Sequence, residues 1–151
     1  MSKKILLLLL FLSTSVCVFA AADKFEKYSG GTISYNEIIA SPKVVFFLWT
    51  TRCPYCRDEL KKMNLEPNIS QYAKFYFVDI GEKSQDVERM VKSLKLKEDI
   101  FSNIILDKDA QMVERFSIIG VPMFIYMRNG KVVDRGYYFD ESILKNNFSN
   151  E

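Results

Sequence analysis

The apolar positions of this chain fall into short runs that alternate with segments of helical periodicity. The run from Val44 to Trp49 is apolar at every position, which is typical of a strand buried on both faces. Other runs rich in β-branched and aromatic residues predict further strands. These strands are expected over residues 74–79, 100–106 and 123–127, with a return strand from 132 to 138. The sheet is therefore expected to form around residues 44–49.

Helix signals stand between these runs. Ser34 and Glu37 have the spacing of a capping box, which predicts a short helix through Ala40. Ser84 and Asp140 are expected to cap two further helices, because apolar residues follow each at helical spacing. The inward residues of these helices are Val87, Met90, Val91 and Leu94 in the first and Ile143, Leu144 and Phe148 in the second. Shorter helices are expected over 56–63 and 111–116, and residues 23–31 form a polar lead-in.

The order of these elements predicts the fold class. Strands that alternate with helices indicate an α/β domain whose sheet is covered on both sides. Asn129-Gly130 between two apolar runs is the strongest hairpin signal in the chain. At 151 residues there is room for one such domain.

The first residues have the pattern of an export signal. Lys3 and Lys4 precede an apolar stretch from Ile5 to Leu12, and Ala20 to Ala22 offer small residues for cleavage. We therefore divide the chain into a signal peptide, residues 1–22, and a folded domain, residues 23–151, in the periplasm or another extracytoplasmic space. An uncleaved N-terminal anchor and lipid attachment at Cys17 are the alternatives.

Removing the leader changes the charge and the cysteine count. The whole chain has a formal net charge of +2, but loss of Lys3 and Lys4 leaves 19 basic residues against 19 acidic ones. A neutral chain without a basic tract gives no support for nucleic-acid binding. Cys17 leaves as well, so the mature chain carries two cysteines, Cys53 and Cys56, in a compartment where disulfide chemistry operates.

Cys53-Pro54-Tyr55-Cys56 stands where the central strand gives way to a helix. A cysteine that caps a helix, with proline at the first helical position, faces unpaired N–H groups that stabilise a thiolate. Arg52 and Arg57 add positive charge. A second cysteine one turn later is placed to attack a mixed disulfide on the first, so the spacing predicts a redox pair.

Three other uses of a Cys-x-x-Cys pair are less well supported. Tetrahedral zinc needs about four nitrogen or sulfur ligands, and the chain has no histidine. Haem attachment needs a histidine directly after the second cysteine, where Arg57 stands. A purely structural disulfide remains an alternative, although an exposed pair in positive surroundings tends to be labile. We therefore expect no metal site and no cofactor beyond a redox-active disulfide between Cys53 and Cys56.

Two motifs together resemble the thioredoxin superfamily. They are Trp49-x-x-x-Cys53-Pro54-Tyr55-Cys56 and Gly120-Val121-Pro122 followed by the Asn129-Gly130 hairpin, and the resemblance covers the chain from about Ser34 onward. It implies a three-layer thioredoxin-like fold with a central mixed sheet, and a cis Pro122 lying against the cysteines. Val121 is then left to pair its backbone with a substrate strand, and Trp49, Arg52, Pro54 and Tyr55 shape the site. The extra helix and strand between Asp79 and Gln111 resemble the exported bacterial TlpA-type group.

The resemblance implies an exported thiol–disulfide oxidoreductase with Cys53 and Cys56 as catalytic residues. Its substrates are protein thiols and disulfides. The expected role is that of a reductant in cytochrome c maturation or thiol maintenance, acting as a monomer and recharged by a partner in the membrane. A disulfide oxidant or isomerase of the same fold, a non-enzymatic adaptor and a Cu(I) carrier are the alternatives. Phe47 replaces the family's buried aspartate, which leaves water or another carboxylate, such as Glu59 or Asp79, to serve Cys56.

Overall fold

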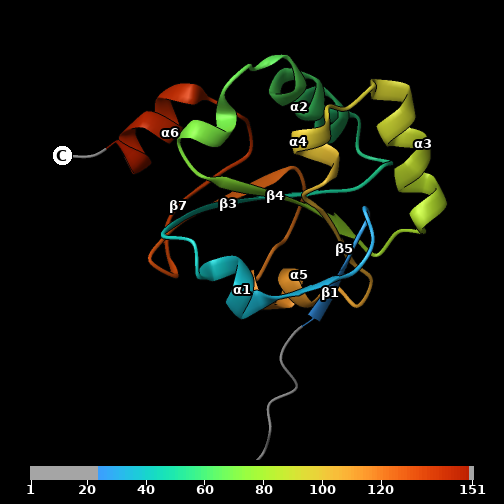
Figure 1. The fold of residues 1–151 in the computed structure, drawn as a ribbon, viewed down its shortest axis with the longest axis horizontal. Helices are drawn as coiled ribbons and strands as arrows, with labels where there is room; N and C mark the ends of the chain where they lie inside the picture. Colours follow the sequence, from blue (N-terminus) through green and yellow to red (C-terminus); the bar gives the residue numbers. More distant parts are fainter. Residues whose placement is uncertain (1–23, 150–151) are drawn as a thin grey trace, which may run out of the picture.

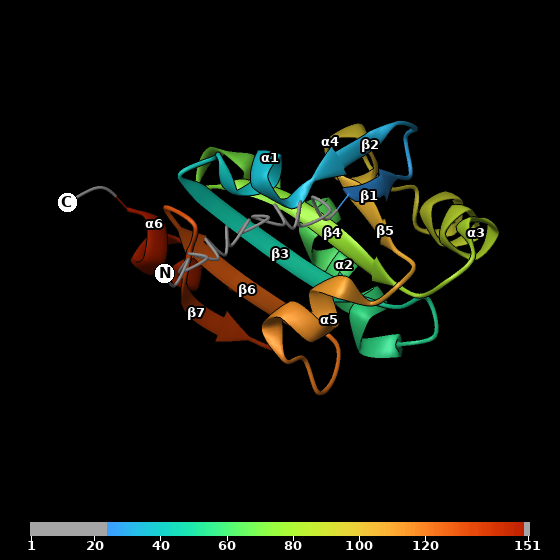
Figure 2. The same cartoon turned by 90° about the horizontal axis from the view of Figure 1, so that it is seen from below.

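The computed structural model describes residues 24–149, which form one seven-stranded mixed sheet with helices on both faces (Figure 1). The strand order across the sheet is β2-β1-β5-β4-β3-β6-β7 (Figure 2). The strands are β1 (Lys24–Lys27), β2 (Thr32–Ser34), β3 (Lys43–Trp49), β4 (Lys74–Ile80), β5 (Ile104–Asp107), β6 (Met123–Arg128) and β7 (Lys131–Gly136). The helices are α1 (Tyr35–Ile39), α2 (Pro54–Leu65), the 3-10 turn η1 (Ile69–Gln71), α3 (Ser84–Leu94), α4 (Glu98–Phe101), α5 (Gln111–Phe116) and α6 (Glu141–Phe148).

Strand β3 lies near the middle of the sheet, as its apolar sequence predicts. It pairs in parallel with β4 and antiparallel with β6, and every residue from Val44 to Trp49 is buried. Because side chains alternate along a strand, Val45, Phe47 and Trp49 face one side of the sheet and Val44, Phe46 and Leu48 the other. Both faces therefore need a covering layer.

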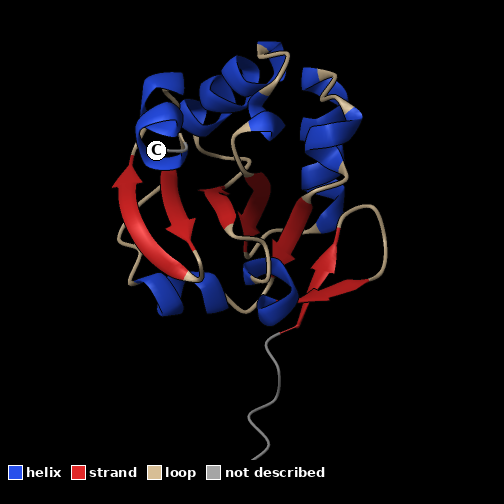
Figure 3. Ribbon diagram, turned by 60° about the vertical axis from the view of Figure 1, so that its left-hand side comes forward, coloured by secondary structure: helices blue, strands red, loops and turns tan. Residues whose placement is uncertain are grey.

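Helices supply those two layers (Figure 3). The larger layer consists of α2, α3, α4 and α6, whose apolar residues pack against Phe47 and Trp49. The smaller one consists of α1 and α5, which cover Phe46 through Ile38, Met112 and Phe116. This is the three-layer α/β fold with a central mixed sheet that the sequence predicts, including the extra elements α3 and β5 between Asp79 and Gln111.

The structure corrects the reading of residues 23–31 as a polar lead-in. Strands β1 and β2 form an antiparallel hairpin there, and β1 continues the main sheet by pairing with β5. Phe25 anchors the hairpin because it is only 2% exposed. One apolar residue in a four-residue strand is too little for a periodic signal, so the sheet begins before Ser34.

Three smaller corrections concern element boundaries. Ile100 belongs to helix α4 rather than to a strand, because its N–H donates to the carbonyl of Lys97. Its side chain is buried, as it would be in the expected strand. Ser84 is the first residue of α3, not its cap; the cap position is Lys83, without a capping side-chain bond. Strand β7 ends at Gly136, two residues before Tyr138. The capping box of Ser34 and the cap at Asp140 are both confirmed.

The expected signal peptide, residues 1–22, lies outside the described residues. Within residues 24–149, no helix is long and apolar enough to cross a membrane.

Candidate active site

The two cysteines stand at the turn between β3 and α2. Cys53 occupies the N-cap of α2 in an extended conformation, and Pro54 takes the first helical position. The N–H of Cys56 points at the Sγ atom of Cys53, 3.1 Å away, and the two sulfurs form a disulfide. The helix therefore directs an unpaired backbone donor at the Cys53 sulfur, where it can stabilise a thiolate after reduction.

The two sulfurs differ in accessibility. Cys53 is partly exposed, whereas Cys56 is fully buried in the core cluster beneath α2. An incoming thiol or disulfide can therefore reach Cys53 but not Cys56 in this state.

The Val121–Pro122 bond is cis and borders the cysteines. The Sγ atom of Cys53 lies 3.8 Å from the carbonyl oxygen of Val121, which is partly buried, while Pro122 is buried. Strand β6, which starts at Met123, is paired with β3, and this pairing brings the two sequence motifs together. The cis bond expected from the resemblance is thus present beside Cys53.

The other predicted site residues divide into exposed and buried ones. Pro54, Tyr55 and Arg52 are exposed, Tyr55 by 73%. Trp49 is fully buried in the same core cluster as Cys56. It therefore supports the pair from the core and offers no surface to a substrate in this state.

Glu82 is a site residue that the sequence reading missed. Its carboxylate accepts hydrogen bonds from the N–H of Thr51 at 2.5 Å and from the Thr51 hydroxyl at 2.8 Å. The same group lies 3.5 Å from the Nε atom of Arg52. Glu82 follows β4, 31 residues from Thr51, and fixes the loop that leads into Cys53. The one feature of the sequence that could have pointed to Glu82 is its position, as an acidic residue in the turn that follows a buried strand.

The two carboxylates left open by the sequence have different surroundings. Glu59 is buried, but one oxygen accepts from Lys62 and the other from the N–H of Phe139, each at 2.6 Å. Asp79 is buried opposite Trp49 in the sheet, and among the described residues neither oxygen has a partner in normal hydrogen-bond geometry, although Glu82 lies close by. Burial, and then the neighbouring Glu82, raise the pKa of the Asp79 carboxyl to about 8. Asp79 therefore holds a proton near neutral pH.

The described residues offer few groups that could bind a metal ion. Within the part of the chain that the structure describes, no three Cys, Asp or Glu side chains converge in an arrangement that could hold a metal ion.

The position of Arg52 leads to a first prediction. Its side chain is 89% exposed and pairs with Glu82, so solvent and that carboxylate screen its effect on Cys53. We expect Arg52→Ala to raise the pKa of the Cys53 thiol by less than about one unit. The rate of alkylation of the reduced protein against pH measures this. Arg57→Ala is the matched control for loss of one nearby positive charge, and a rise well above one unit for Arg52→Ala would contradict the prediction.

Comparisons with known proteins agree with this geometry. The family model of a thioredoxin-like domain matches residues 38–146, so the chain belongs to the thioredoxin-like domain family. Its cysteine pair has the arrangement of a thiol–disulfide oxidoreductase. No curated protein sequence matches the chain.

Several solved structures share the fold at low sequence identity. StoA from Bacillus subtilis is 23% identical, with a TM-score of 0.65 over 83% of this chain and 95% of that one. The thioredoxin domain of a thiol-disulfide oxidoreductase from Bacteroides vulgatus is 22% identical, with a TM-score of 0.67 over 85% and 94%. A secreted Mycobacterium tuberculosis disulfide oxidoreductase homologous to E. coli DsbE is 16% identical, with a TM-score of 0.66 over 82% and 92%.

Proposed function

We propose that this protein is an exported thiol–disulfide oxidoreductase that reduces disulfides in protein substrates through Cys53 and Cys56. The observation that carries the proposal is the asymmetry of the pair. One sulfur is accessible at a helix N-terminus, and the other is buried one turn away. A structural disulfide needs no such difference, whereas stepwise exchange does.

The reaction proceeds in two exchanges. The Cys53 thiolate of the reduced protein attacks one substrate sulfur, forming a mixed disulfide and releasing the other substrate sulfur as a thiolate that takes up a proton. The Cys56 thiol then loses its proton and attacks the Cys53 sulfur of the mixed disulfide. This forms the Cys53–Cys56 disulfide and releases the second substrate thiol. Two electrons pass from the protein to the substrate, so a further reductant must restore the dithiol.

The backbone around Val121 supports a protein substrate. Pro122 has no N–H, and the Val121 carbonyl lies beside Cys53, so an extended substrate segment can pair there without competition from a neighbouring strand. The names of the structural neighbours, among them a secreted disulfide oxidoreductase, support an extracytoplasmic location. We propose a periplasmic monomer that is recharged by a membrane partner, with residues 1–22 removed as a signal peptide.

The redox state of the cysteines in the protein's own envelope tests the direction of electron flow. We expect acid quenching followed by alkylation to find Cys53 and Cys56 mainly as thiols, because a reductant must be kept reduced. The purified dithiol should also reduce insulin, and N-terminal sequencing of the same material should begin near Ala21 or Asp23.

Other outcomes separate the alternatives. A pair found fully oxidised in the envelope indicates a disulfide oxidant. A dithiol that does not reduce insulin contradicts the proposed activity, and an intact Met1 on cytoplasmic protein contradicts export.

A further inference from the structure

A groove runs along α3 beside the cysteine pair. It consists of two hollows of about 430 and 320 Å³, and both are lined by Thr51, Asp86 and Arg89. Thr51 is two residues before Cys53, and Arg52 and Arg57, which also line the groove, flank the Cys53-Pro54-Tyr55-Cys56 motif. Helices α2 and α3 lie on the same face of the sheet (Figure 1), and the lining of the groove includes residues of α3. We call it the α3 groove.

Positive charge predominates in the α3 groove. Its lining includes the cations Arg52, Arg57, Lys83 and Arg89 and the acids Glu82 and Asp86, a formal excess of two positive charges. Glu82 is buried and already bound to Thr51 and Arg52, and Asp86 pairs with Arg89. Arg57 and Lys83 form no ion pair with any residue between 24 and 149 that the structure describes. Two exposed cations therefore line the groove without an ion-pair partner among the described residues.

The opposite side of the cysteines is apolar instead. Ile119, in the loop before Pro122, is 93% exposed, and Tyr55, in the motif that contains the cysteines, is 73% exposed. In the sheet, β4 lies on one side of β3, and the residues that follow β4 line the groove; β6, which follows Pro122, lies on the other side of β3. Asp79 does not offset the groove at neutral pH, because burial raises the pKa of its carboxyl to about 8. A bound segment thus meets apolar surface on one side of Cys53 and positive charge on the other.

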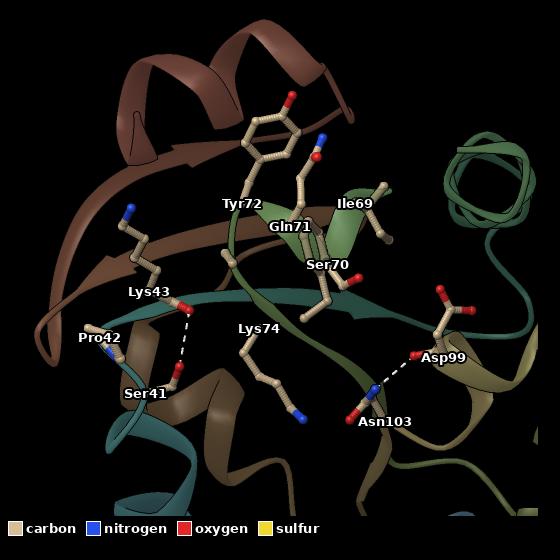
Figure 4. A pocket seen from close by; sticks show the side chains of 12 residues that line it. Ser41, Pro42, Lys43, Ile69, Ser70, Gln71, Tyr72, Lys74, Asp99 and Asn103 are labelled. Carbon is tan, nitrogen blue, oxygen red and sulfur yellow. Dashed lines mark hydrogen bonds between the residues drawn. The ribbon is translucent and has the colours of Figure 1, made fainter. Parts of the chain in front are cut away.

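A separate hollow of about 340 Å³ lies too far from the cysteines to take part. It is lined by Lys43 and Lys74, the first residues of β3 and β4, whereas the cysteines follow the last residue of β3 (Figure 4). The Ser41 hydroxyl and the Asn103 amide in its wall bond to backbone carbonyls of the same wall.

We infer that the α3 groove selects protein substrates whose reactive disulfide is flanked by an acidic segment. Carboxylates in that segment pair with Arg57 and Lys83 while the substrate sulfur lies at Cys53, and Arg89, which pairs with Asp86, adds to the positive charge of the groove. Arginine binds carboxylates through two parallel hydrogen bonds, and a positive groove also raises the rate of encounter with an acidic partner. This inference rests on the proposed function and names the substrate class of the same site.

Single-turnover kinetics with matched peptides test the inference. Three disulfide-linked peptide dimers differ only in the residues flanking their single cysteine, which are aspartates, asparagines or lysines. The reduced protein is mixed with each dimer and the release of peptide thiol is followed. The two exchanges described above convert one peptide disulfide into two thiols and the dithiol into the Cys53–Cys56 disulfide. At low salt we expect the aspartate peptide to react about tenfold faster than the asparagine peptide, and the advantage to shrink in about 0.5 M NaCl.

Two double variants show whether the groove causes the preference. Lys83→Gln/Arg89→Gln removes two cations of the groove, and we expect the ratio of aspartate to asparagine rates to fall to about two or less. Lys24→Gln/Lys131→Gln removes the same net charge from exposed positions on β1 and β7 and should keep the tenfold ratio. Lys83 and Arg89 are chosen over Arg52 and Arg57 because the latter two adjoin the cysteines.

The outcomes are distinguishable. Equal rates for the aspartate and asparagine peptides, or an aspartate advantage that survives in Lys83→Gln/Arg89→Gln, overturn the inference while leaving the oxidoreductase activity intact. Failure to reduce any of the three peptides overturns the proposed function, and the inference with it.

Discussion

Cys56→Ser should trap the protein on its substrate. Cys53 still attacks the substrate disulfide, but the serine hydroxyl cannot resolve the mixed disulfide, so a covalent complex accumulates. We expect turnover of insulin to fall to the uncatalysed rate, with a product on non-reducing gels that disappears on addition of dithiothreitol. The expectation follows from accessibility, because Cys53 is partly exposed and Cys56 is fully buried.

Cys53→Ser is the matched control. It removes the accessible sulfur and leaves the buried one, so both turnover and trapping should be lost. Mass spectrometry of the trapped Cys56→Ser complex should find the substrate on Cys53. If Cys53→Ser instead trapped substrate through Cys56, the assignment of the two roles would be wrong.

Much of the fold could be predicted because its signals are local. The buried strand Val44–Trp49, the capping box at Ser34 and the hairpin at Asn129-Gly130 each depend on residues a few positions apart. The cysteine pair is local in the same way, and its helix N-terminus follows from Pro54 and the preceding strand. The cis bond before Pro122 has no local signal and was expected only from the resemblance to a family.

The features that the sequence did not predict depend on distant contacts. Glu82 holds Thr51 across 31 residues, and strand β1 pairs with β5 about 80 residues later. Both contacts depend on the strand order. The pairing of β3 with β4 brings the residues that follow these two strands together, and the side of β5 that faces away from β4 is free to pair with β1. Ile100 shows a second limit of prediction from sequence. A single buried apolar residue does not distinguish a short helix from the start of a strand.

The difference between the surroundings of Glu59 and Asp79 also depends on distant contacts. Both residues are buried, and nothing in the sequence distinguishes the surroundings of one carboxyl from those of the other. Lys62 and the Phe139 N–H donate to the two oxygens of Glu59, whereas those of Asp79 have no partner in normal hydrogen-bond geometry among the described residues. A buried carboxyl without donors is unstable when charged and is retained most easily as the neutral acid.

This makes stability depend on pH through Asp79. Burial raises the pKa of its carboxyl from 3.8 to about 8 in the folded protein. Between about pH 4 and pH 8 the folded state therefore holds a proton that the unfolded chain has lost. The free energy of unfolding accordingly decreases as pH rises through this window and levels off above the folded pKa.

Asp79→Asn should remove this dependence, because asparagine is a neutral side chain of nearly the same shape. At pH 8.5 we expect the variant to be more stable than the wild type by on the order of 5 kcal/mol, and at pH 4.5 by only about 1 kcal/mol. Urea unfolding of the oxidised proteins at several pH values measures the difference. Asp109→Asn, at an exposed position after β5, is the control and should show no such change with pH. A stability difference between Asp79→Asn and the wild type that stays constant from pH 4.5 to pH 8.5 would show that Asp79 is ionised in the folded protein, and that Glu82 and its neighbours tolerate a second buried charge beside the loop that carries Cys53.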